Sequence, residues 1–132
     1  MASSDPPLSD KQLTAAVTDA MVALHQRYYH RIPVTAKTLM LADDLMVCVL
    51  GGVYTDVEKT LIELQRSTTV QETRSAFQMA MQQKFIEAVE RLSGRSVLAF
   101  ISNHHVGPDI EIEIFMLRPD QDVTSEGSEI TV

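Results

Sequence analysis

The sequence predicts an α+β fold in two layers, in which four mostly antiparallel strands pack against a long helix. Two observations carry this prediction. The segment Thr69–Leu92 has the apolar period of a helix, and a pair of strand-like runs lies on each side of it in the chain. A long apolar stripe needs a wide surface to pack on, and a sheet built from two hairpins supplies one. The predicted element order is α-β-β-α-α-β-β.

The long helix is predicted from apolar residues that recur at steps of three or four, while charged and amide side chains fall largely elsewhere. The apolar residues are Phe77, Met81, Phe85, Ala88 and Leu92. Gly94 follows the segment, where a left-handed C-cap residue fits.

Three segments have the spacing of a capping box, in which a Ser or Thr hydroxyl accepts a backbone N–H and a Glu or Gln three residues later reaches back. We therefore expect helices to begin at Ser9, Thr55 and Thr69. The first runs to about Tyr29 on an apolar stripe. The second is short, ends near Gln65, and is separated from the long helix by Ser67 and Thr68.

The first predicted hairpin consists of Val34–Leu41 and Leu45–Leu50, joined by a turn that contains two aspartates. Aspartate favours such turns because its side chain hydrogen-bonds locally. The second run is apolar on both faces, which is typical of an inner strand.

The second predicted hairpin consists of Ser96–Asn103 and Ile110–Leu117, joined by a loop. Isoleucines and Met116 alternate with Glu111 and Glu113 in the last strand. Period-two alternation places the two sets on opposite faces, and we expect the glutamate face to be the solvated one.

Composition and charge bound the class of protein. The chain has 132 residues, a net charge of −7 and one cysteine, Cys48. Six of the eighteen acidic residues, and no basic ones, lie in 1–10 and 120–132, so the body is nearly neutral. We expect a disordered lead at 1–8, one domain at 9–119 and a disordered acidic tail at 120–132.

The same features exclude several partners and compartments. No basic patch predicts nucleic-acid binding, and no apolar run is long enough to insert into a membrane. The N-terminus has no basic region followed by an apolar one, and the lone cysteine favours a reducing environment. A cytoplasmic location is therefore expected.

Two clusters are candidates for contact with a ligand or partner. Arg27, His30 and Arg31 end the first predicted helix, where basic groups also complement the helix dipole. His104 and His105 are adjacent, so on an extended strand they point to opposite faces and cannot easily share one metal ion. We expect a polar loop there, and no cofactor, metal or catalytic residue.

A resemblance to the MpsC-like family rests on short motifs whose order and spacing agree over about residues 11–118. In the second half these are RSAFQ at 74–78, Gly94-Arg95, SVLAFIS at 96–102, Pro108-Asp109 and EIFML at 113–117. In the first half, Pro33 precedes a strand that ends at Gly51 or Gly52, and GVYTDVE at 52–58 is similar to the family's GVLTPAE-like segment. At 29–33 the chain reads YHRIP, where the family often has a glycine-rich GRGP segment.

The resemblance implies a small accessory subunit beside a membrane complex that translocates sodium, generates a membrane potential and is linked to bicarbonate uptake. It implies no catalytic residue. The alternative from the residues is a small-ligand or anion-sensing domain that uses the Arg27–Arg31 cluster and the end of the sheet.

The apolar surfaces predict a homodimer. Three helices carry apolar stripes, and a four-stranded sheet has room for about two helices side by side on one face, at 8–10 Å each. The surplus surface, on the sheet or on the helices, is most simply buried by a second copy.

Overall fold

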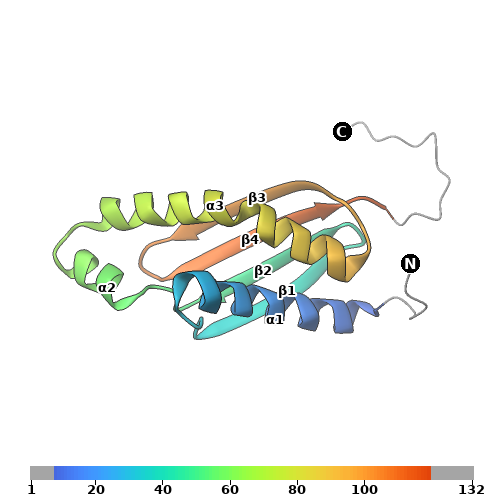
Figure 1. Cartoon of the computed structure of the whole chain (residues 1–132), viewed down its shortest axis with the longest axis horizontal. Helices are drawn as coiled ribbons and strands as arrows, with labels where there is room; N and C mark the ends of the chain where they lie inside the picture. Colours follow the sequence, from blue (N-terminus) through green and yellow to red (C-terminus); the bar gives the residue numbers. More distant parts are fainter. Residues whose placement is uncertain (1–7, 120–132) are drawn as a thin grey trace.

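Three helices and four strands follow one another along residues 8–119, the part of the chain that this computed structural model describes (Figure 1). The α+β class and the predicted order are confirmed. In chain order the elements are α1 (Asp10–Tyr29), β1 (Thr35–Ala42), β2 (Leu45–Gly51), α2 (Asp56–Glu63), α3 (Ser67–Ser93), β3 (Val97–His105) and β4 (Ile110–Leu117). The lead and tail predicted at the termini lie outside the described residues, except for Leu8.

The strands form one antiparallel sheet in the order β1-β2-β4-β3, so β2 is an inner strand as predicted. The two hairpins meet through the β2–β4 ladder, in which Val47 pairs with Ile114 and Val49 with Ile112. Each hairpin follows its own helix, which gives the chain two α-β-β halves, α1-β1-β2 and α3-β3-β4. Their inner strands are antiparallel neighbours, so the halves are arranged about an approximate two-fold axis between β2 and β4.

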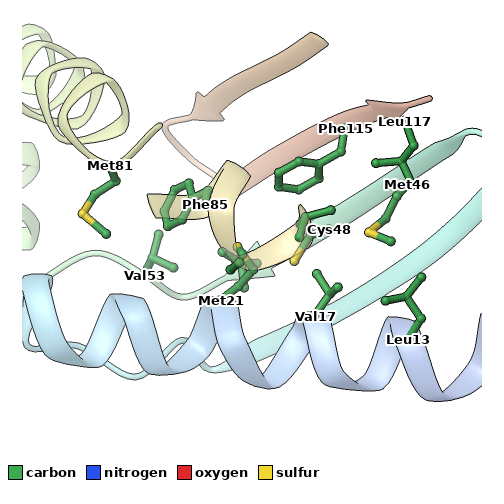
Figure 2. Packing of buried hydrophobic residues seen from close by; sticks show 13 residues of the cluster. Leu13, Val17, Met21, Met46, Cys48, Val53, Met81, Phe85, Phe115 and Leu117 are labelled. Atoms are coloured by element: carbon green, nitrogen blue, oxygen red, sulfur yellow. The ribbon is translucent and has the colours of Figure 1, made fainter. Parts of the chain in front are cut away.

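Both long helices cover the same face of the sheet: α1 packs on β1, α3 packs on β3, and the two helices contact each other (Figure 1). Figure 2 shows Val17 and Met21 of α1 pointing toward Cys48 of β2. α2 packs against α3, near the end of the sheet. The core between helices and sheet comprises Leu13, Val17, Met21, Met46, Cys48, Leu50, Val53, Met81, Phe85, Ala88, Val89, Phe115 and Leu117.

The alternation of β4 is confirmed, but the expected orientation of its two faces is wrong. Glu111 and Glu113 face the helices and have no exposed surface, whereas Met116 on the other side is 41% exposed. The face away from the helices, which we call the open sheet face, is covered by no element of the described chain. Its apolar residues include Leu39, Leu45, Val47, Val49, Ile101, Ile110, Ile112, Ile114 and Met116.

Two of the three predicted capping boxes are present. The side chains of Ser9 and Thr55 each accept from the backbone N–H three residues on, and Gln12 and Glu58 reach back. The prediction for Thr69 is wrong. α3 begins at Ser67 with no side-chain cap, and the Thr69 N–H already donates to the Arg66 carbonyl at 3.1 Å. The break between α2 and α3 therefore lies at 64–66, before Ser67.

The loop predicted after residue 103 begins later, because β3 continues to His105. The extension pairs His104 with Glu111 and His105 with Ile110 across the β3–β4 ladder. The left-handed C-cap predicted at Gly94 is confirmed, with φ of 71°.

Candidate functional site

A cluster of charged side chains is sealed between the helices and the sheet, and Arg74 of α3 lies at its centre. The guanidinium has no exposed surface and donates twice to Glu58 of α2, from Nη2 to Oε1 at 2.8 Å and from Nε to Oε2 at 3.1 Å. Its Nη1 donates to Oε1 of Glu111 on β4 at 3.3 Å. A planar guanidinium suits such forked contacts, and the two carboxylates together offset the cost of burying it.

His25 of α1 joins the cluster through a contact with Glu111. Its Nδ1 lies 2.9 Å from the Met21 carbonyl oxygen, which can only accept, so Nδ1 carries a hydrogen. Its Nε2 lies 3.0 Å from Oε2 of Glu111. Burial opposes ionisation of Glu111, but the Glu113 carboxyl, His25 and Arg74 together lower the pKa of Glu111 to about 2. An ionised Glu111 carboxylate accepts a hydrogen bond from Nε2 when this nitrogen carries a hydrogen.

Glu113 is the second buried carboxyl of β4, two residues beyond Glu111. Burial, and then the neighbouring Glu111, raise the pKa of Glu113 well above its usual value. The polar side chains beside its carboxyl group are those of Glu111 and Ser102. Burial therefore favours the neutral form of Glu113. The carboxyl groups of Glu58 and Glu111 share the Arg74 guanidinium, while Glu113 makes no ion pair among the described residues.

Two tyrosines enclose the guanidinium of Arg74. The ring centres of Tyr29 and Tyr54 lie 4.8 and 5.0 Å from its central carbon, within the range of cation–π attraction. The Tyr29 hydroxyl donates to Glu58. Burial and this contact with the Glu58 carboxylate raise the pKa of Tyr29. The Arg74 guanidinium is thus held by carboxyl groups that accept from its N–H groups and by two aromatic rings that pack against it.

The cluster can stabilise the fold but cannot act on a substrate that remains in solvent. His25, Arg74, Glu111 and Glu113 are each 0% exposed. They come from α1, α3 and β4, and Glu58 adds α2, so the cluster ties all three helices to the sheet. Among the described residues no group of three His, Cys, Asp or Glu side chains is placed to hold a metal ion.

The structure places Arg27, His30 and Arg31 at the C-terminal end of α1, outside the cluster. His30 is the left-handed C-cap, and Arg31 donates from Nε to the Gly52 carbonyl at 3.2 Å. His30 and Arg31 line a shallow, open depression with Gln26 and Ile32, while Arg27 stacks on Tyr28. The negative end of the helix dipole lies here and does not favour an anion.

His104 and His105 point in opposite directions, as adjacent strand residues do. His104 Nδ1 lies 3.1 Å from Oε1 of Gln78 on α3, on the side of the buried cluster. Burial, and then the nearby Arg74 charge, lower the pKa of His104. His105 Nδ1 lies 3.1 Å from the Pro108 carbonyl in the hairpin loop. The structure therefore does not bring the five predicted contact residues together.

The cluster was not predicted from the sequence, although two signals for it were present. The buried stripe of α1 runs through Leu13, Val17 and Met21 at steps of four, and His25 is the next step. In α3, Arg74 occupies the same face as Val70 and Met81. A charged residue at a core position of a helix indicates a buried partner, but the carboxylate of Glu111 comes from far along the chain.

These features define a small α+β domain with a sealed ionic core and an uncovered apolar sheet face. The chain belongs to the MpsC family, described as Na⁺-translocating membrane potential-generating system (MpsC), which matches residues 9–119. The expected family is therefore confirmed. A comparison with curated proteins and one with solved structures each found no significant match. Within residues 8–119, no helix is both long enough and apolar enough to cross a membrane.

Proposed function

We propose that the chain is a cytoplasmic, non-enzymatic accessory subunit that binds other proteins of a Na⁺-translocating, membrane potential-generating system and acts as a homodimer. Membership of the family supports the association with that system. The observation that carries the accessory role is the separation of polar and apolar groups. The acid–base groups of the cluster are sealed inside, and a broad apolar face remains uncovered.

The sealed cluster supports a role without catalysis. A general acid or base must come within hydrogen-bond reach of the proton that it transfers. His25, Glu111 and Glu113 cannot do so without separation of α1 or α3 from the sheet, because both helices lie over them. The thiol of Cys48 is equally unsuited to nucleophilic attack, because burial raises its pKa to about 11.

Contiguous apolar surface supports association with a second protein chain, such as the other copy of the proposed homodimer. Soluble monomers rarely expose an apolar patch larger than a few hundred Å². The open sheet face carries apolar side chains on all four strands, including Leu39, Val47, Ile101 and Ile112. Anion sensing at the end of α1 has weaker support, because the depression there is shallow and Arg31 already bonds to Gly52.

Inverted membrane vesicles test the accessory role. They are prepared from cells that produce the membrane subunits of the system with or without this chain, and a voltage-sensitive dye reports the membrane potential. We expect a several-fold larger Na⁺-dependent potential when the chain is present, and recovery when purified protein is added back. Replacing Na⁺ by K⁺ is the control. Equal potentials with and without the chain would contradict the proposal.

A further inference from the structure

We infer that the open sheet face binds the same face of a second copy, so that two sheets pack against each other with their helices outside. This inference rests on the proposed homodimer and names its surface. For the dimer contact, the sequence leaves open whether the sheet or the helices supply the surface, and this inference assigns the sheet. The composition of the face, its area and the other available occupants support this assignment.

The middle of the open sheet face is apolar and uncharged. Val47 and Val49 of β2 lie directly beside Ile114 and Ile112 of β4, as the register of the central ladder shows. β-branched side chains have few rotamers, so burying them loses little conformational entropy. Two sheets pack face to face through such rows at a separation of about 10 Å.

More exposed apolar groups surround this centre. Leu39 on β1, Ile101 on β3 and Met116 near the end of β4 are 47%, 58% and 41% exposed. Polar groups lie toward one end of the face, where Lys37 and Asn103 extend from the two edge strands. An uncharged apolar centre with polar groups at its margin is the anatomy of a protein interface.

The area is sufficient for a specific dimer. The strands contain 8, 7, 9 and 8 residues. At ~3.3 Å per residue and ~4.8 Å between strands, the face measures roughly 26 by 19 Å, or about 500 Å² in flat projection. Side chains that stand out from the sheet add to this area. Two copies therefore bury about 1,000 Å² in flat projection, which is close to the area of about 1,000 Å² that a specific interface should exceed.

A second copy fits this face better than the other occupants. Residues 120–132 carry four carboxylates. Binding this segment to an uncharged apolar surface would remove water from the carboxylates without giving them a hydrogen-bond or ion-pair partner. An anionic lipid surface would repel a chain of net charge −7, and no basic rim surrounds the face. A copy of the same face brings no charge to the centre, and a two-fold axis buries both faces at once.

Light scattering after size-exclusion chromatography at tens of micromolar tests the inference. The chain has a mass of 14.7 kDa, and we expect the wild-type protein at twice that mass. Ile112→Glu puts a charge in the centre of the face and should give a mass of one chain. Met79→Glu is the matched control, because Met79 is 73% exposed on α3 and lies away from the sheet, so it should leave the dimer intact.

Melting curves establish that each variant is folded, and a second measurement covers loss of folding in Ile112→Glu. Val49→Cys places a thiol on the open face, and Ala80→Cys places one on the exposed side of α3. Oxidation should link two copies through residue 49 at least tenfold faster than through residue 80.

Three results would overturn the inference: a monomeric wild type, a folded Ile112→Glu dimer, or equal cross-linking at the two positions. A wild-type monomer that dimerises only when residues 120–132 are removed would assign the face to the tail. None of these results alters the vesicle measurement, so failure of the dimer and failure of the accessory role are distinguishable.

Discussion

Glu111 and Glu113 are two residues apart on the same face of β4, both without exposed surface, and their surroundings shift the pKa values of the two carboxyl groups in opposite directions. Glu111 contacts the Arg74 guanidinium and the His25 imidazole. Glu113 makes no ion pair among the described residues, and the charge of Glu111 beside it makes ionisation of Glu113 still less favourable. One strand therefore contains one carboxyl group whose surroundings favour the ionised form and another whose surroundings favour the neutral form.

The first prediction concerns Glu113→Gln, which replaces the acid by an uncharged group of the same shape. A raised native pKa stabilises the fold below the unfolded value of 4.5, and that contribution is lost as pH rises through the native value. The free energy of unfolding of the wild type should therefore fall with pH above about 4.5. The variant should be as stable as the wild type or more stable at pH 8, and its stability should vary less with pH.

Glu111→Gln provides the opposite case for the same measurement. The pKa of Glu111 is lowered to about 2, so its contribution is present above 4.5 and is lost as pH falls toward 2. This variant should be strongly destabilised at pH 7, because Arg74 and His25 lose a partner. Guanidinium midpoints from pH 4 to 9 check both variants, and equal losses at pH 7 would contradict the assignment.

The second prediction concerns Arg74→Met, which removes the central charge and keeps an unbranched apolar side chain. Glu58 and Glu111 would then lie buried without the guanidinium. We expect the free energy of unfolding to fall by about 3–5 kcal/mol, as when one partner of a buried ion pair is removed. Urea unfolding measures the loss. Arg91→Met, at an exposed position on the same helix, should change it by less than about 0.5 kcal/mol.

The third prediction separates the helix caps. Thr55→Ala removes the hydroxyl that accepts from the Glu58 N–H at 3.2 Å, and should cost about 1 kcal/mol. Thr69→Ala should lower the free energy of unfolding by only a few tenths of about 1 kcal/mol, because the Thr69 side chain caps no helix end. Chemical denaturation of the two variants is the measurement. A larger loss at Thr69 would place the start of α3 at a different residue.

The fourth prediction compares two glycines with positive φ, Gly52 at 66° and Gly94 at 71°. Alanine is strained at both positions, at a cost on the order of 1 kcal/mol. At Gly52 the new Cβ would also lie 2.5 Å from Cγ2 of Val34, whereas at Gly94 it meets nothing within 4 Å. Gly52→Ala should therefore lower the melting temperature by several degrees more than Gly94→Ala, and similar shifts would contradict the close approach.

The fifth prediction concerns Cys48, whose thiol is fully buried and has a pKa raised to about 11 by burial. At pH 8 the native protein should react with a thiol reagent at least a hundredfold more slowly than the protein unfolded in guanidinium. A chromogenic disulfide reagent measures both rates. Rapid labelling of the folded protein would show that α1 opens from the sheet.

Much of the fold was predictable because local patterns determine it. Capping boxes at Ser9 and Thr55 located two helix starts, and the apolar run around Cys48 identified an inner strand. These signals lie within a few residues of the structure that they specify. At Thr69 the same kind of signal was misleading, because Gln65 with φ of 64° turns the chain early enough for α3 to begin at Ser67.

The site was not predictable in the same way. Alternation in β4 separates glutamates from isoleucines, but it does not state which set faces the helices. The answer depends on Arg74 and His25, which lie 37 and 86 residues from Glu111 in the chain. A buried carboxylate is stable only where such partners meet it, and no local pattern contains that information.

The arrangement of the chain as two α-β-β halves has a consequence for how the protein can be divided. Within the sheet the halves meet only at the β2–β4 ladder. A cut after Tyr54 would give two fragments, each with one complete hairpin and the long helix that packs on it. His25 and Tyr29 would belong to one fragment, and their carboxylate partners Glu111 and Glu58 to the other. These buried contacts would then favour reassembly with the correct partner fragment. Contacts that stabilise the single chain would thus serve as recognition contacts between two chains.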